Sequence, residues 1–207
     1  MSTARDEILG RVRSALAGSA PPEPVVRAYR RRGNGAHPQV VELLCERLAD
    51  YKAEVRRVGA DDLPAAIAET CTARGVVRLV VPPGLPHAWR PAELEVVEDH
   101  GLTPRELDAL DGVVTACTLA IAETGTLILS AQPDEGRRAL TLVPDVHICI
   151  VREHQVVDGV PAAFAQLDAV ARRPLTLVSG PSATSDIELS RVEGVHGPRQ
   201  LVVLVAP

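Results

Sequence analysis

The sequence has very few aromatic residues, since Phe, Trp and Tyr together make up only 2 % of it. Proteins that bind single-stranded nucleic acids usually stack the bases on clustered aromatic side chains, and those that bind duplexes present a basic face. This chain has a formal net charge of −5, and its basic run at Arg27–Arg32 suits a solvated or partner-contacting linker. The composition argues against nucleic-acid binding and predicts a core of Val, Leu, Ile and Ala.

Closely spaced cysteines are also absent. The four cysteines (Cys45, Cys71, Cys117 and Cys149) are at least 26 positions apart, so the sequence has neither a zinc nor an iron–sulfur spacing. Cys117 and Cys149 lie in apolar stretches and are predicted to be buried free thiols, which indicates a reducing compartment. The sequence contains no apolar signal-peptide core and no run near the ~18 residues that span a membrane. We therefore expect a cytoplasmic protein.

Several motifs of known chemistry are missing. The sequence has no GxGxxG, GxxxxGK[ST] or GxSxG, which argues against dinucleotide-binding, P-loop and serine-hydrolase sites. It has no HxH or HExxH either, so we expect no metal site. The 207 residues are enough for one domain that folds without disulfides. We expect an N-terminal helix with a Pro/Gly/Arg-rich linker over residues 1–36 and a single domain over residues 37–207.

Hydrophobic periodicity predicts an alternation of helices and short strands. Helices are expected over 4–17, around 40–48, over 62–73 with Pro64 in the first turn, over 103–110 behind the capping box of Thr103 and Glu106, and over 161–172 with Phe164, Leu167 and Val170 on one face. Apolar strands are expected at 55–58, 76–81, 94–97, 113–122, 126–130, 147–151, 175–178 and 201–205. This order is typical of an α/β fold with a mostly parallel sheet flanked by helices.

Three segments rich in glycine and hydroxyl groups are the best candidates for a binding site. Residues 122–126 contain Glu123 in the run AETGT, residues 179–188 form SGPSATSDIE, and residues 194–198 form GVHGP around His196. Ligands of open α/β sheets bind beyond the carboxyl ends of the strands. We therefore expect the three segments to converge at one rim of the sheet and to form an anion-receptive cleft from backbone N–H groups and hydroxyls.

Each of these segments also has a purely structural interpretation. Glu123 is either a nucleophile or general base or a solvated carboxylate in a turn. Asp186 either contacts a ligand or caps the following helix. His196 either transfers protons near neutral pH or forms a structural hydrogen bond in its loop. The residues alone leave these alternatives open.

The segments IAETGTLILS, LVSGPSATSDIE and GVHGP, in this order, resemble the lactate utilisation protein C family over roughly residues 110–207. The resemblance implies the fold of ribose-phosphate isomerases, glucosamine-phosphate deaminases and CoA transferases. It also implies that the protein oxidises L-lactate to pyruvate together with two partner proteins that hold iron–sulfur clusters, while this chain holds no cofactor and binds a small anion. The site positions carried over are Glu123 and His196 as catalytic candidates, and Thr124, Gly125, Thr126, Gly180, Ser182, Thr184, Asp186, Glu188, Gly194 and Gly197 as ligand-binding candidates.

One position departs from the family pattern. Ala183 stands where the family is expected to have an arginine, whose guanidinium binds a carboxylate through two hydrogen bonds. Arg137 or Arg138 is the candidate replacement. Two other functions remain open: a stand-alone enzyme that acts on a sugar phosphate or an acyl-CoA thioester through Glu123, and a module that senses a small carboxylate.

Overall fold

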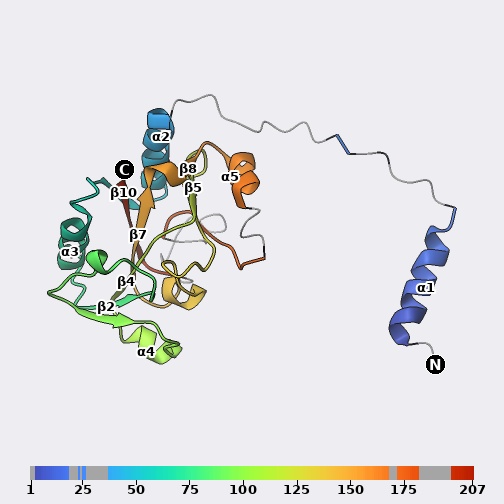
Figure 1. Ribbon diagram of the computed structural model, residues 1–207, viewed down its shortest axis with the longest axis horizontal. Helices are drawn as coiled ribbons and strands as arrows, with labels where there is room; N and C mark the ends of the chain where they lie inside the picture. Colours follow the sequence, from blue (N-terminus) through green and yellow to red (C-terminus); the bar gives the residue numbers. More distant parts are fainter. Residues whose placement is uncertain (1–2, 19–22, 24, 27–36, 168–171, 182–196) are drawn as a thin grey trace, which may run out of the picture.

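The computed structural model describes residues 3–18, 23, 25–26, 37–167, 172–181 and 197–207. The first helix, α1 (Ala4–Leu16), begins at a capping box formed by Thr3 and Asp6, and none of its residues is buried. In Figure 1 it lies apart from the other elements. The helix predicted at this position is therefore confirmed, with its apolar side exposed.

Six parallel strands form the main sheet, in the order β1-β10-β7-β4-β2-β3 (Figure 1). Valine, isoleucine and leucine dominate the central strands, and the residues of β4 are all buried. This arrangement confirms the predicted α/β fold with a mostly parallel sheet. The bounds of the strands are β1 (Glu54–Arg57), β2 (Arg78–Val81), β3 (Glu95–Glu98), β4 (Gly112–Thr115), β7 (Val146–Arg152) and β10 (Gln200–Ala206).

A second sheet of four short strands has the order β8-β5-β6-β9, in which β6 runs antiparallel to both β5 and β9. The prediction of one strand over 113–122 is wrong, because β4 and β5 belong to different sheets. The backbone N–H of Ala116 donates to the carbonyl of Asp134, and the backbone N–H of Thr118 donates to the carbonyl of Ile128 in the second sheet. The chain therefore leaves the main sheet after β4. The strands of this second sheet are β5 (Leu119–Ile121), β6 (Thr126–Leu129), β8 (Val156–Val157) and β9 (Thr176–Val178).

The remaining helices are α2 (His37–Asp50), α3 (Leu63–Ala73), α4 (Pro104–Asp108) and α5 (Val160–Gln166), with 3-10 turns η1 (His87–Trp89), η2 (Arg138–Thr141) and η3 (Glu153–Gln155). The predicted capping box of Thr103 and Glu106 starts α4. The face predicted for α5 is wrong in part, because Phe164 is exposed while Leu167 is buried, and Val170 lies outside the described residues. No described helix is long and apolar enough to cross a membrane.

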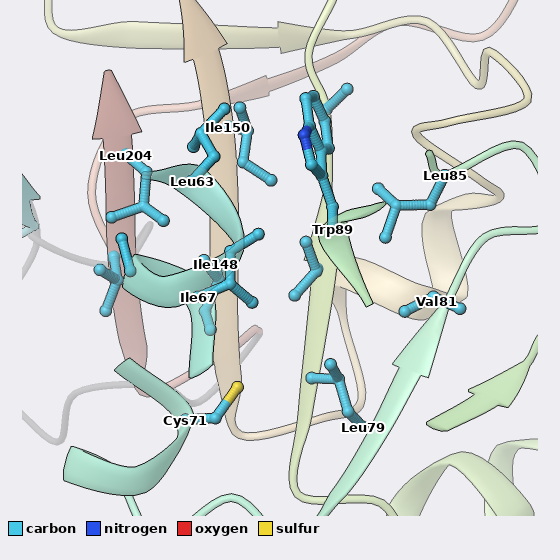
Figure 2. Packing of buried hydrophobic residues seen from close by; sticks show 14 of the residues in the cluster. Leu63, Ile67, Cys71, Leu79, Val81, Leu85, Trp89, Ile148, Ile150 and Leu204 are labelled. Carbon is cyan, nitrogen blue, oxygen red and sulfur yellow. The ribbon is translucent and has the colours of Figure 1, made fainter. Parts of the chain in front are cut away.

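The two faces of the main sheet are covered differently. On one face, Leu63, Ile67 and Cys71 of helix α3 pack against Ile148 and Leu204 (Figure 2). Trp89 belongs to the same hydrophobic cluster. On the other face, α2 and the second sheet pack against β7 and β10. Aliphatic side chains thus form the core on both faces, as the composition predicts. Cys117 and Cys149 lie in the second layer and are buried as expected.

Candidate functional site

The carboxyl edge of the main sheet has a topological switch point between β2 and β4, because β2 leads to β3 on one side and β4 leads to β7 on the other. Open α/β sheets usually bind ligands at such a point. Here the turn Gln132–Gly136 fills it: Gly84 N donates to Pro133 O at 2.9 Å, and Ala116 N to Asp134 O at 3.0 Å. A Cβ on Gly84 would lie 2.5 Å from Pro133. Contacts this close leave no room for a ligand beside Gly84.

Glu135 anchors this turn. Its carboxylate is only 1 % exposed, and it accepts hydrogen bonds from Thr118 Oγ1 at 2.5 Å, Ser130 N at 2.6 Å and Gln132 N at 3.0 Å. Burial raises the pKa of Glu135, and the three donors oppose this rise. Since the carboxylate is fully engaged by the protein's own donors, its role here is to hold the turn.

Arg137, the residue that follows the turn, is also fully engaged. Its Nε and Nη2 donate to the two oxygens of Asp99 at 2.6 and 2.8 Å, and it also donates to the carbonyl of Leu102. The hydrogen bond from Arg137 holds the pKa of Asp99 below its usual range. One of the two arginines proposed as an anion binder is therefore already paired with a carboxylate.

A pocket of 80 Å³ lies near the other edge of the sheet, where η2 and β9 meet the amino-terminal ends of β7 and β10. The described residues that line it are basic, hydroxyl, glycine or apolar, and none of these is acidic. A cation without a carboxylate beside it favours an anionic ligand. The lining residues are Arg138, Thr141, His147, Leu177, Val178, Ser179, Gly180, Pro181, Gly197, Pro198 and Leu201.

Arg138 supplies the positive charge of this pocket. Its Nη1 donates to the carbonyl and the hydroxyl of Thr141, at 2.8 and 2.7 Å, and these two bonds fix the side chain to its own 3-10 turn. Among the described residues it has no carboxylate partner. The residue is exposed as a whole, and burial of part of its guanidinium lowers the pKa of that group. Arg138 thus differs from its neighbour Arg137 in having its charge unmatched.

His147, the second residue of β7, forms part of the pocket wall and is buried. Its Nε2 is 2.8 Å from Thr115 Oγ1 on β4. Behind it, a hydrogen bond with Cys117 holds the pKa of the buried Cys149 below that of an ordinary thiol, with smaller effects of His147 and Thr115 in the same direction. The same bond raises the pKa of Cys117. Sequence reasoning predicted His147 only as a half-buried residue at the start of a strand.

The three predicted segments meet in part. Thr126 Oγ1 lies 2.7 Å from Thr124 Oγ1 and 2.8 Å from Ser179 Oγ, which joins the first segment to the second. Gly180 has φ +79° and packs so closely on Tyr51 that a Cβ would lie 2.5 Å from its carbonyl oxygen. Gly180 and Gly197 both line the pocket. The described ends of the second and third segments therefore face one cavity, with Thr124 and Thr126 behind Ser179.

The location of this meeting point differs from the expected one. The first segment is the hairpin turn between β5 and β6, and the second follows β9, so both belong to the second sheet. Gly197 and Pro198 precede the amino end of β10. The described parts of the three segments therefore do not lie beyond the carboxyl ends of the main strands, where we expected them.

Glu123 does not line the pocket. Glu123 is exposed and lies in the hairpin turn that also contains Gly125. Its backbone N–H donates to Asp158 O at 3.0 Å, and its carboxylate lies next to Gly159. Six of the other predicted site residues lie outside the described residues: Ser182, Thr184, Asp186, Glu188, Gly194 and His196. Ala183 lies outside them too. Thr141 and His147 were missed, because a threonine in a short turn and a histidine in a strand carry no motif.

A second cavity, of 480 Å³, lies beside α3 and has a different character. Its described lining includes Glu69 and Glu93, and the other described lining residues are Ala68, Thr72, Ala73 and Leu94. The Glu69 carboxylate is paired with Arg56 at 2.8 Å, and Glu93 repels a negatively charged ligand. The cavity with Arg138 and His147 therefore suits an anion better than this one does.

The comparisons with known protein families, sequences and structures agree with one another. The LUD domain model matches residues 41–206. "Lactate utilization protein C" of Deinococcus radiodurans is 45 % identical, and the alignment covers 98 % of this chain and 95 % of the relative. "Lactate utilization protein C" of Halalkalibacterium halodurans is 28 % identical, and the alignment covers 96 % of this chain and 93 % of the relative. A crystal structure of a DUF162 family protein from Deinococcus radiodurans matches with a TM-score of 0.74 and 40 % identity, over 84 % of this chain and 99 % of that one.

Proposed function

This chain belongs to the LUD domain family, and we propose that it acts in the utilisation of lactate, as the names of its relatives indicate. In this proposal it is a cytoplasmic subunit that binds a small carboxylate. Two partner proteins with iron–sulfur clusters accept the electrons that lactate loses on oxidation to pyruvate. The absence of close cysteine pairs in the sequence supports this division of roles.

The observation that carries the proposal is the unmatched charge of Arg138 in the pocket. The guanidinium is held by Thr141 and has no carboxylate beside it in the described part of the chain. A planar guanidinium binds a carboxylate through paired hydrogen bonds, which are stronger than neutral ones. Arg138 therefore takes the role that an arginine at the position of Ala183 was expected to have.

The size of the pocket supports a small ligand. Pockets for cofactors and drug-sized molecules usually measure ~300–1,000 Å³, whereas the described residues here enclose 80 Å³. A compact carboxylate suits this space better than a nucleotide or the acyl-CoA thioester of the alternative hypothesis.

The experiment is a reconstitution of lactate oxidation from the full chain and the proteins encoded by its two neighbouring genes. We expect the complete mixture to oxidise L-lactate and the mixture without this chain to fail. An Arg138→Gln variant should lower lactate affinity by roughly 10- to 100-fold, the effect of losing a hydrogen bond to a charged group. Arg105→Gln, at an exposed arginine of α4, is the matched control.

Two results would contradict the proposal. One is an unchanged rate of lactate oxidation when this chain is left out, and the other is wild-type lactate affinity in Arg138→Gln. The alternative of catalysis by Glu123 is tested in the same assay with Glu123→Gln. Because Glu123 is exposed and does not line the pocket, we expect this variant to retain activity.

A further inference from the structure

Helix α1 has an apolar face that no other described element covers. Ile8, Val12 and Leu16 follow one another at four-residue spacing and are 62 %, 48 % and 62 % exposed. Together with Leu9 they form an apolar stripe along one side of the helix, and no residue of α1 is buried. Figure 1 shows α1 apart from the other elements, and the LUD domain model begins only at residue 41. The helix is therefore an addition to the domain that the family shares.

A helix of this length gains most of its stability from packing. It has 13 residues, and isolated helices shorter than ~12–15 residues are marginal in water. The capping box of Thr3 and Asp6 and the ion pair between Arg11 and Glu7 at 2.7 Å stabilise it only locally. Of the two cavities of the domain, one measures 80 Å³, too little for a helix, and the other has carboxylates in its described lining. The stripe therefore suits a partner other than this chain's own domain.

We propose that the α1 helices of two copies of this chain pack together in antiparallel orientation, with stripe against stripe. A twofold axis then brings Ile8 of one copy near Val12 of the other, so that both copies use the same surface. The apolar side chains of both helices leave water, which drives the association. This inference does not rest on the proposed function.

The charged side chains beside the stripe favour the antiparallel orientation, because charges along such a seam decide how two helices pair. At about 3.6 residues per turn, Glu7 and Arg11 follow one side of the stripe. Asp6 and Arg13 follow the other side. In an antiparallel pair each side meets its own counterpart running the opposite way, so carboxylates face guanidinium groups on both sides. In a parallel pair the two different sides meet, so like charges face each other.

Arg5 lies within the stripe, near the start of α1, and also fits the antiparallel pair. It would lie beside the last turn of the second helix, where free carbonyl groups carry the negative end of the helix dipole. Its long side chain can cover apolar surface while the guanidinium stays in water. The seam is short, because 13 residues span only ~20 Å. We therefore expect a weak dimer that depends on protein concentration.

Sedimentation equilibrium of the full chain measures this association. We expect the mean mass to rise from 22.0 kDa toward twice that value as the concentration increases from ~1 µM to ~1 mM, the range of weak affinities. Val12→Asp puts a charge into the stripe and should leave the chain monomeric throughout. Gly10→Asp adds the same charge on the opposite side of α1, where a Cβ would meet nothing within 4 Å, and should dimerise like wild type.

The orientation is tested with Glu7→Arg and Arg11→Glu. Each variant alone places like charges opposite each other in the antiparallel pair and should lower the dimer fraction. An equimolar mixture of the two should recover the dimer, because the arginines of one variant meet the glutamates of the other. Both variants lack the ion pair within one helix, so recovery in the mixture reports contact between copies.

The outcomes decide the inference. A monomer at every concentration would overturn it, and so would a dimer that persists in Val12→Asp, since its interface would lie elsewhere. A mixture that does not recover would overturn the antiparallel pairing. If Val12→Asp lowered the melting temperature of the monomer, α1 would dock on its own domain and the inference would be wrong. Lactate oxidation is measured separately, so failure of this inference is distinguishable from failure of the proposed function.

Discussion

The charged side chains at the two edges of the main sheet differ in whether they have a partner of opposite charge or a set of hydrogen-bond donors. At the carboxyl edge, the turn Gln132–Gly136 fills the switch point, Glu135 is surrounded by three donors, and Arg137 is paired with Asp99. Near the amino ends of β7 and β10, the exposed Arg138 has no carboxylate partner among the described residues. Matched charges stabilise the fold, whereas unmatched ones beside a cavity favour a ligand. Four predictions test this difference.

The largest effect is expected for Glu135→Ala, which removes a buried carboxylate that accepts hydrogen bonds from Thr118, Ser130 and Gln132. The buried N–H of Ser130 would lose its partner, and the hydroxyl of Thr118 would keep only Ser130 Oγ. We expect a loss of about 3 kcal/mol in the free energy of unfolding, the scale for buried polar groups left unpaired. Urea unfolding at pH 7 measures it, with Glu93→Ala, beside the second cavity, as the control. A change under ~0.5 kcal/mol, typical of a surface substitution, would contradict the role of Glu135.

Arg137→Gln should cost about 2 kcal/mol at pH 7, between the value of an exposed ion pair and that of a buried one, because Arg137 is 41 % exposed and Asp99 only 4 %. The hydrogen bond from Arg137 lowers the pKa of Asp99 below 3.8. The stability of the pair is therefore present above that pH and lost as the pH falls through the lower folded value. Urea unfolding between pH 2 and pH 7 should show the variant and wild type converging in acid. A difference independent of pH would show that the ion pair is not its source.

The pH dependence at Glu135 should have the opposite sign. Burial raises the pKa of Glu135 above 4.5, so the folded state holds its proton to higher pH than the unfolded state does. As the pH rises from about 4.5 through the higher folded value, ionisation of this group should lower the stability of the protein. Glu135→Gln, which cannot ionise, should lack this decline in urea unfolding. Parallel pH profiles for wild type and variant would refute the shift.

The smallest effect on stability is expected for Arg138→Gln. Arg138 has no carboxylate partner in the described chain, and its bonds to Thr141 lie within one 3-10 turn. We expect a change within ~0.5 kcal/mol in urea unfolding, as for a surface substitution, although the same variant should lose ligand affinity. A loss as large as that of Arg137→Gln would show that Arg138 is structural and would remove the distinction between the two arginines.

Local signals in the sequence predicted much of the fold. The capping box of Thr103 and Glu106 and the β-branched strands act over a few residues, and both appear in the structure. The split of the segment 113–122 between two sheets was not predictable. It depends on hydrogen bonds from Ala116 and Thr118 to the distant residues Asp134 and Ile128, and an uninterrupted apolar run carries no sign of them.

The site shows the same limit. Arg137 and Arg138 are adjacent and identical, so no pattern in the sequence could tell that Asp99 pairs with one of them and not the other. Glycine-rich turns identified Gly180 and Gly197, because a pocket near the backbone needs residues without side chains. His147 was missed as a candidate, since its neighbour Thr115 comes from another strand and is brought close only by the parallel pairing of β4 and β7.

A crystal structure of the full chain with bound L-lactate would show directly where the acid binds. We expect electron density for lactate in the pocket near the amino ends of β7 and β10, with its carboxylate ~3 Å from the Arg138 guanidinium. Lactate bound at the turn Gln132–Gly136 or beside Glu123, with the pocket filled by water, would contradict it.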